Sequence, residues 1–487
     1  MTRAALITAA LGAATLLSRL PFASQRLWAW DSVLYARALE DGFHVDYALA
    51  TQRPHPPGYV LYVGVASLFR SVVGDSNTAL VLVSALGSAL AVAALYLLAR
   101  RFAGERAALV VALGFAVDPL VWQYSEIAYP YTVLAFMSVA LASMFWVART
   151  RGARATLVAS VVFGAAAGFR QDLLLIVGPL WLWTLWPYGA RIRVAALAAL
   201  GTGCLVWFVP SALLSGGPLA YVDAVLHQAN YVRDTYSVSD EGLAAFTTNL
   251  GTTLYALAWG LGAFAIPLLL LVQNDARRAF RERRLALGTV ETFLVIWIVP
   301  ALAFYVALHI GEWGYVLSVL PGLYVVAARG LEQAFASAAV VRSAALGAAV
   351  VAASAALFVA APLPFSTAAV AQHDAELMAR VSYVREHFPA NRTLMLARED
   401  FLLVRYYLPE YRAWLHDPDP YHVALHRKRT RNVNTIVVFT PGLVADKHVG
   451  ARSLECAKGI RLVYLEVEPG AIVEFYGAGY SLTEDSR

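Results

Sequence analysis

The chain has 487 residues, of which 59% are hydrophobic and only 15% charged, and its net charge is +5. A soluble globular protein carries about 25% charged residues, so this composition excludes an ordinary soluble protein and predicts one embedded in a membrane. The positive charge comes from arginines between apolar segments, which excludes a nucleic-acid-binding footprint. Cys204 lies in an apolar segment and Cys456 near the C-terminus, so no disulfide is predicted.

Apolar runs recur along most of the chain, each long enough to cross a bilayer core of about 30 Å. Short loops that carry Arg favour the cytoplasm, and placing five such loops and Arg3 on that side predicts eleven spanning helices with the C-terminus outside. The compact loops favour a bacterial inner membrane. The first run is interpreted as a retained helix, since no convincing signal-peptide cleavage site precedes Trp28. The predicted spans are 4–20, 78–99, 106–122, 128–148, 154–169, 173–187, 193–214, 248–272, 289–308, 313–329 and 342–362.

Another apolar run, Gly58–Phe69, is too short to span and is predicted to lie on the outer membrane surface. If it spanned instead, the arginine-bearing loops after it would face outward. Polar residues concentrate in the segments that this topology places outside, which predicts a working face there. These segments are 21–77, 124–127, 170–172, 215–247, 309–313 and the tail from residue 363.

Two domains are predicted: a transmembrane domain over residues 1–362, with a first outer loop at 21–77, and a small soluble α/β domain outside over 363–487. The tail has helical patterning over 370–387 and β-like runs at 393–396, 435–439, 461–467 and 471–476. It contains no glycine-rich phosphate loop and no Cys/His metal spacing, so no cofactor is predicted.

Asp31 lies just beyond the first span, beside Trp28 and Trp30, which suit the membrane interface. A partly desolvated carboxylate can act as a general base because desolvation raises its pKa toward the working pH. The alternative is a helix cap, in which Asp satisfies free backbone N–H groups at a helix start. The residue alone does not separate these two interpretations.

Further along the first loop, the run Arg53-Pro54-His55-Pro56-Pro57-Gly58-Tyr59 combines cationic side chains with prolines that rigidify the backbone. Cationic or donor side chains at head-group level suit a phosphate ligand. Ordinary anchoring to head groups is the alternative for Arg53 and His55.

Three other polar groups interrupt apolar runs at outer ends. Glu126 lies between two long runs, where a carboxylate indicates function by default. Arg170 and Asp172 form a second group, which an internal ion pair would also explain. His309 and Glu312 form the third.

The loop 215–247 carries His227, Tyr231 and Arg233, a mixture that fits sugar stacking or phosphate pairing as well as a solvated loop. Each group alone is weak evidence. Their joint position on one face predicts a membrane-embedded site, open to the outside, lined by carboxylates and arginines. Such a site suits an enzyme that acts on a lipid-linked anionic donor.

At these residues the chain resembles the GT-C superfamily of integral-membrane glycosyltransferases, in the branch of protein O-mannosyltransferases and aminoarabinose transferases. The resemblance is best over residues 25–150 and continues afterwards in topology alone. It departs from the family in having a single Asp next to the first helix rather than an Asp-Asp or Asp-Glu pair at that place. The residues that carry it are Asp31, the run His55-Pro56-Pro57-Gly58-Tyr59-Val60-Leu61-Tyr62, Ser84-Ala85-Leu86, and Glu126 with Tyr129 nearby.

The resemblance implies transfer of a sugar, with inversion, from a polyprenyl-phosphate donor to an acceptor hydroxyl on the outer face of the membrane. Asp31 would take the acceptor proton, and Glu126 would bind the acceptor or orient the site. Arg53, His55 and Arg170 would face the donor phosphate, whose leaving charge needs stabilisation. The branch generally works without a metal, although a divalent ion stays open. The acceptor is a lipid, a glycan or a protein, and membrane lipids surround the chain.

A transporter or lipid flippase is the alternative function. It predicts inverted repeats and polar residues near mid-membrane. No clear repeat is present, and the polar residues cluster at the outer ends of spans. A non-catalytic assembly or sensor subunit would make Asp31 dispensable.

Overall fold

The computed structural model describes residues 2–46, 52–282, 288–336, 340–360, 363–416, 428–440, 443, 450–476 and 479–483. The chain divides into two compact units. The first comprises Met1–Ser24 and Tyr35–Val370, and the second comprises Gln25–Leu34 and Ala371–Arg487.

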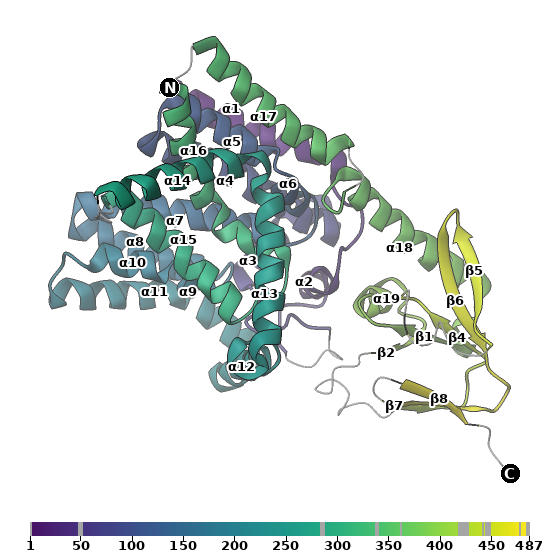
Figure 1. The fold of residues 1–487 in the computed structure, drawn as a ribbon. Coiled ribbons are helices and arrows are strands. Elements are labelled where there is room, and N and C mark those ends of the chain that lie inside the picture. Colours follow the sequence, from purple (N-terminus) through teal and green to yellow (C-terminus); the bar gives the residue numbers. More distant parts are fainter. Residues whose placement is uncertain are drawn as a thin grey trace. The chain divides into compact units, whose positions relative to one another are not determined.

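The first unit is a bundle of helices (Figure 1). In chain order its elements are α1 (Arg3–Arg19), η1 (Leu20–Phe22), α2 (Trp30–Glu40), which begins in the second unit, α3 (Val60–Val73), α4 (Ser76–Phe102), α5 (Glu105–Ala116), α6 (Pro119–Glu126), α7 (Tyr131–Arg151), α8 (Ala153–Ala166), α9 (Leu173–Ile176), α10 (Gly178–Leu185), α11 (Ala190–Leu214), α12 (Pro218–Tyr236), α13 (Val238–Leu261), η3 (Gly262–Phe264), α14 (Ala265–Glu282), α15 (Thr289–Ala307), η4 (Trp313–Ser318), α16 (Leu320–Ala336) and α17 (Val340–Ala360).

Short polar side chains cap the starts of α4 and α6. Asp75 accepts a hydrogen bond from Thr78 N at 2.7 Å and caps α4. Asp118 accepts one from Val121 N at 2.9 Å and caps α6, whose first residue is Pro119. This second cap interrupts an apolar stretch, and α5 and α6 meet there at a bend of 51°.

Helices α4 and α7 form the inside of the bundle. In the most apolar stretch of each helix, 67% of the residues of α4 and 61% of those of α7 are buried, against 17% in α1 and in α11. Hydroxyl groups join the two helices, because Ser84 Oγ donates to Tyr129 O and Thr132 Oγ1 donates to Ser84 O, each at 2.7 Å. Hydrogen bonds of this kind are typical of helix contacts inside a membrane.

Helices α8 and α11 approach each other through small residues. A Cβ at Gly164 would collide with the backbone of α11, and one at Gly203 would collide with the backbone of α8. Trp207 Nε1 donates to Gly164 O at 2.8 Å across the same contact. Close backbone packing over glycine is a common way for membrane helices to associate.

The fold is that of a polytopic helical membrane protein, as the sequence predicts. Helical structure lies at each of the eleven predicted spans. Among the described residues, six helices are long and apolar enough to cross a membrane alone, and the bent pair α5 and α6 would make a seventh. The exact count of eleven therefore stays a prediction.

Helices α3 and α12, like α2, lie in segments that the sequence predicts outside the membrane spans. The short apolar run becomes α3, whose Leu68 and Val72 are 70% and 84% exposed. The predicted loop 215–247 contains α12, which has Pro218 as its first residue and ends before Ser237. Leu219 and Leu226 of α12 are 87% and 58% exposed, so both helices present apolar side chains on their surface.

The second unit is an α/β domain, as the sequence predicts for the tail. Its five-stranded sheet has the order β2-β1-β4-β6-β5, in which β1 runs parallel to β2 and β4 while β6 is antiparallel to β4 and β5 (Figure 1). A three-stranded sheet has the order β3-β7-β8. The elements are α18 (Thr367–His387), which begins in the first unit, η5 (Ala390–Arg392), β1 (Thr393–Ala397), α19 (Phe401–Tyr407), β2 (Arg412–Leu415), β3 (Lys428–Thr430), β4 (Thr435–Val438), β5 (Arg452–Ala457), β6 (Ile460–Glu466), β7 (Ile472–Tyr476) and β8 (Gly479–Thr483).

The core of this domain is apolar and formed mainly by its larger sheet. Leu394, Leu396, Ile436, Val438 and Leu465 are each at most 2% exposed and belong to one cluster. The domain also includes Gln25–Leu34, a segment from the start of the chain that carries Asp31. The sequence does not predict this association.

Candidate active site

Arg170 lies in the turn between α8 and α9 and is only 3% exposed. Its Nε donates to both carboxylate oxygens of Asp172, at 3.2 and 3.1 Å, and its Nη2 donates to Oδ2 at 2.8 Å. The Nη1 group makes no hydrogen bond within the described part of the chain. A buried guanidinium thus has one neutralising partner and one group of donors still available.

Three tyrosine rings enclose this guanidinium. The Arg170 Cζ lies 5.2 Å from the ring centroid of Tyr59, 4.8 Å from that of Tyr131 and 4.5 Å from that of Tyr315. A cation within about 6 Å of a ring face is attracted by the ring quadrupole. The rings come from the turn before α3, from the start of α7 and from η4, so Arg170 joins three distant parts of the chain.

Glu312 belongs to the same aromatic cluster. Tyr124 OH donates to its Oε2 at 3.2 Å, and Tyr129 OH lies 3.5 Å from its Oε1. The Tyr131 ring packs against Tyr124 and Tyr129, with centroids 5.1 and 5.4 Å apart. Tyr131 therefore contacts both the cation Arg170 and the tyrosines that hold the Glu312 carboxylate.

His309 extends the cluster. Its ring lies 5.9 Å from that of Tyr315 and 4.6 Å from that of Tyr236. Its buried Nδ1 makes no hydrogen bond with any described residue. Burial, and then the charge of Arg170, lower the pKa of His309 to about 4, so the imidazole is neutral at pH 7 and can both donate and accept hydrogen bonds.

The proline-rich turn of the first loop places Tyr59 in this cluster. Gly58 has φ +90°, and a Cβ there would collide with Val45 and Phe43. Tyr59 itself has φ +51°, in the left-handed region that non-glycine residues seldom adopt. The turn thus requires Gly at 58, and the strained backbone of Tyr59 directs its ring to Arg170.

Helix α12 holds the same turn from another side. Tyr221 is 3% exposed and its hydroxyl donates to Pro57 O at 3.0 Å. His55 Nδ1 lies 2.9 Å from Pro56 O, and the His55 ring is 6.1 Å from the Tyr59 ring. His55 therefore lies next to the cluster through Tyr59.

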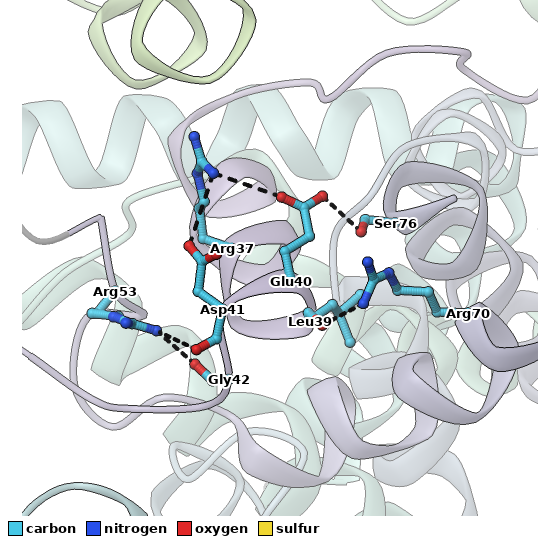
Figure 2. A network of polar contacts seen from close by, with 8 residues as sticks. All are labelled: Arg37, Leu39, Glu40, Asp41, Gly42, Arg53, Arg70 and Ser76. Atoms are coloured by element: carbon cyan, nitrogen blue, oxygen red, sulfur yellow. Dashed lines mark hydrogen bonds and ion pairs between the residues drawn. The ribbon is translucent and has the colours of Figure 1, made fainter. Parts of the chain in front are cut away.

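Arg53 serves a different contact in this structure. Its Nη1 donates to the carbonyl oxygens of Asp41 and Gly42, at 3.3 and 2.7 Å, just past the C-terminus of α2 (Figure 2). Arg70 Nη1 donates to Leu39 O at 2.5 Å at the same helix end. Cations at a helix C-terminus satisfy free carbonyls and the helix dipole. The other contacts drawn in Figure 2 join Arg37, Glu40, Asp41 and Ser76.

Asp31 lies in the first turn of α2 and is partly buried. It belongs to the second unit, with Gln25–Leu34. A carboxylate in a first turn is stabilised by the helix dipole, so the position suits a helix-start role as well as a base. On α2 itself, Asp31 precedes Tyr35 by four residues, which places both side chains on one face of that helix.

Glu126, at the end of α6, lies in a second buried cluster of charge. It is fully buried, and neither of its carboxylate oxygens has a hydrogen-bond partner among the described residues. Arg19, 1% exposed, acts on it electrostatically. The Arg19 guanidinium lies 4.4 Å from the Trp122 ring centroid, and its Nη2 donates to Ala116 O at 2.5 Å. Tyr124, two residues before Glu126, contacts Glu312, so α6 borders both clusters.

The three candidates on α12 differ in their surroundings. Tyr231 OH lies 3.3 Å from Tyr236 OH, and the Tyr236 ring contacts His309. Arg233 pairs with Asp234 at 2.7 Å, and both side chains are more than half exposed. His227 is exposed. Tyr231 thus connects to the aromatic cluster, whereas Arg233 faces an exposed ion-pair partner.

The structure brings together Tyr59, Arg170, Asp172, His309 and Glu312. We call this group, with the tyrosines that contact it, the Arg170 cluster. The sequence does not single out the following members of the two clusters: Tyr124, Tyr131, Tyr236, Tyr315 and Arg19. The available signal was the concentration of tyrosines in the run Tyr124–Tyr131, which flanks Glu126.

No group of three or more His, Cys, Asp or Glu side chains within the described ranges is placed to hold a metal ion. The Asp172 carboxylate accepts hydrogen bonds from the Arg170 guanidinium, and the Glu312 carboxylate contacts the hydroxyl groups of Tyr124 and Tyr129. The Arg170 cluster therefore does not fit a resident metal.

Comparison with known proteins identifies the fold. Residues 55–213 match the family model described as dolichyl-phosphate-mannose-protein mannosyltransferase. This range contains Tyr59, Glu126, Tyr131 and Arg170 but less than half of the chain. No curated protein matches the sequence.

Solved structures match over a larger part of the chain. ArnT from Cupriavidus metallidurans bound to undecaprenyl phosphate has a TM-score of 0.59 at 13% identity, with 94% of this chain and 97% of that chain covered. An oligosaccharyltransferase from Archaeoglobus fulgidus, in complex with Zn and sulfate, has a TM-score of 0.52 at 15% identity, with 89% and 67% covered. The same archaeal protein tethered to an acceptor peptide has a TM-score of 0.51 at 15% identity, covering 88% and 68%.

The comparisons bear out the resemblance expected from the sequence, and the structural matches show that the chain has the fold of these two proteins.

Proposed function

We propose that this chain is a membrane glycosyltransferase that moves a sugar from a polyprenyl-phosphate-linked donor to an acceptor hydroxyl on the outer face of the membrane. The carrying observation is the Arg170 cluster, a buried guanidinium inside an aromatic enclosure. Its members Tyr59, Tyr131 and Arg170 lie within the residues that match the mannosyltransferase model. The match to ArnT, a structure bound to undecaprenyl phosphate, supports the lipid-linked donor.

Arg170 suits the phosphate of such a donor. A guanidinium stabilises phosphate oxygens through directed N–H groups and full positive charge. Asp172 occupies the Nε and Nη2 edge and leaves Nη1 for a ligand. Because the site is buried, each interaction with developing negative charge is stronger than it would be in water.

The neutral part of the cluster suits the sugar. Aromatic rings offer stacking surfaces, and the His309 imidazole and the tyrosine hydroxyls offer donors and acceptors without net charge. The Glu312 carboxylate, held by Tyr124, adds an acceptor for sugar hydroxyls. We assign these residues to sugar binding and orientation.

The reaction is a single displacement. The acceptor oxygen forms a bond to the anomeric carbon while the bond from that carbon to the phosphate oxygen breaks, so the configuration inverts. The acceptor hydroxyl proton passes to Asp31, and the products are the glycosylated acceptor and polyprenyl phosphate. Arg170 stabilises the charge that develops on the leaving phosphate. No step requires a metal, and metal dependence is left to the assay.

Glu126 is assigned to orienting the acceptor side of the site from its buried position on α6. The outward orientation of the site follows from the arginine-bearing loops, which the sequence places in the cytoplasm. A bacterial inner membrane with the C-terminal domain outside is part of the same proposal.

The test is transfer of radiolabelled sugar from a panel of polyprenyl-phosphate donors by purified protein in liposomes. Wild type is compared with Asp31→Asn, Glu126→Gln and the matched control Asp275→Asn, an exposed carboxylate on α14. We expect the first variant to lose at least a hundredfold in rate, because general-base catalysis supplies roughly 10²–10⁴-fold. The control should retain activity. Equal rates for wild type and Asp31→Asn would remove Asp31 from the mechanism and leave Glu126 to be examined.

A further inference from the structure

The segment that carries Asp31 is held by the C-terminal domain through its backbone. The Gln25 N–H donates to Asp374 Oδ2 at 2.6 Å, and the Leu27 N–H donates to Tyr407 OH at 2.9 Å. Both acceptors lie on helices of the second unit, Asp374 on α18 and Tyr407 on α19. Side-chain acceptors for the amides of residues 25 and 27 fix the path of the backbone.

Aromatic contacts hold the same segment. The Trp28 ring lies 4.3 Å from the His373 ring at an interplanar angle of 31°. The Trp30 ring lies 6.4 Å from the Phe401 ring. Leu27 is only 1% exposed. Aromatic pairs contribute about 0.5–1.5 kcal/mol beyond their burial, so these contacts hold the part of the segment between its hydrogen bonds and Asp31.

The residues that hold the segment are themselves fixed within the domain. Arg385 Nη2 donates to Tyr407 O at 2.5 Å, and Arg385 Nε donates to Glu410 at 3.0 Å. Helix α19 follows β1 and precedes β2, two paired strands of the larger sheet. The position of Tyr407 is therefore set by the domain's sheet and by α18.

We propose that the C-terminal domain positions Asp31 through residues 25–30. Asp374 and Tyr407 are positioning residues, and their partners are the backbone amides four to six residues before the base. This inference rests on the proposed function, in which Asp31 takes the acceptor proton. It assigns the domain a role in the chemical step rather than in stability or partner binding alone.

The magnitude follows from the geometry that proton transfer requires. A misplacement of about 1 Å by a distant mutation can lower a rate by roughly a hundredfold. Loss of one of several contacts should displace the segment less, so we expect Tyr407→Phe to lower kcat by roughly ten- to a hundredfold. The donor KM should stay near its wild-type value, because the Arg170 cluster belongs to the other unit.

The test compares Tyr407→Phe with the matched control Tyr411→Phe in the full-length protein. Tyr411 OH also bonds to backbone oxygens, of Val384 and Phe388 at 3.0 and 2.7 Å, but within the domain and away from residues 25–34. Two quantities are measured: kcat and KM for radiolabelled transfer, and hydrogen–deuterium exchange of the peptide covering residues 24–34.

The proposal expects faster exchange in that peptide together with a lower kcat for Tyr407→Phe, and neither change for Tyr411→Phe. Faster exchange with an unchanged kcat would show that the domain holds the segment without positioning the base. Unchanged exchange would show that this contact does not hold the segment. Either result overturns the proposal. Absence of transfer in wild type would instead count against the proposed function, and the exchange measurement would still decide whether the domain holds the segment.

Discussion

Replacing Arg170 by Met separates its structural role from its proposed role in binding the donor phosphate. Met fills much of the aromatic enclosure but leaves the Asp172 carboxylate, 17% exposed, without its cation. Removing one partner of a buried ion pair costs about 3–5 kcal/mol. The lost cation–π contacts with three rings, each worth about 0.5–2 kcal/mol, overlap with that cost and do not simply add to it. We expect a destabilisation near 4 kcal/mol, taken from the middle of the ion-pair range.

The double variant Arg170→Met with Asp172→Asn removes both charges. An ion pair replaced on both sides by well-packed hydrophobic residues is often close to neutral for stability. Because Asp172→Asn keeps a polar amide, this double variant should recover part of the lost stability. It should not recover transfer, because the guanidinium proposed to face the phosphate is still missing. The expected pattern is a stable protein with a donor KM raised at least tenfold and a lower kcat.

Thermal unfolding in detergent measures the first quantity, and steady-state transfer at varied donor concentration measures the second. Recovery of both stability and transfer in the double variant would refute the reasoning, because it would reduce Arg170 to an internal counter-ion for Asp172. That outcome would favour the alternative that the sequence also allows, in which Arg170 and Asp172 form only an internal ion pair.

Four further predictions follow from single contacts. Gly58→Ala should lower the unfolding midpoint, since its left-handed φ and the collision with Val45 cost about 1–2 kcal/mol or more; an unchanged midpoint would contradict the turn geometry. Tyr221→Phe removes the hydrogen bond to Pro57 O, worth about 1 kcal/mol, and should raise donor KM severalfold in the transfer assay, whereas an unaltered KM would disconnect α12 from the site. The pKa of His309 is lowered from 6.5 to about 4, so between these pH values the unfolded state binds a proton that the folded state does not. The free energy of unfolding should therefore fall as the pH decreases from 6.5 to about 4. The unfolding midpoint should depend less on pH in His309→Gln, and the same pH dependence in both proteins would argue against a buried neutral imidazole. Alkaline phosphatase fused to the C-terminus should be active in a bacterial host, and an inactive but expressed fusion would place the C-terminal domain in the cytoplasm.

The elements of the fold were largely predictable because their signals are local. Long apolar runs predict helices at the right places, and the patterning of the tail predicts α18, β1, β4, β6 and β7 within a few residues. The helix α12 was not predictable in this way, because its mixed polar and apolar residues resemble a surface loop until Tyr221 is seen packing inward. The bend between α5 and α6 depends on the Asp118 cap inside an otherwise apolar stretch.

The candidate site was predictable in part. Charged residues at the ends of spans are visible in the sequence, and Arg170, Asp172, His309 and Glu312 were found in that way. Which of them meet depends on packing between helices far apart in the chain, as when Tyr131 contacts Arg170 and Tyr315. The sequence also gives no sign that Arg53 turns toward the end of α2, or that residues 25–34 join a domain formed by the last part of the chain.

The most direct test of the central claim is a product balance for purified wild-type protein in liposomes that contain a polyprenyl-phosphate sugar labelled separately in its sugar and its lipid. The proposed reaction predicts that glycosylated acceptor and free polyprenyl phosphate appear in equal amounts, and that both appear much more slowly with the Arg170→Met and Asp172→Asn double variant. Intact labelled donor that crosses the bilayer without cleavage would contradict glycosyl transfer and identify a lipid flippase instead.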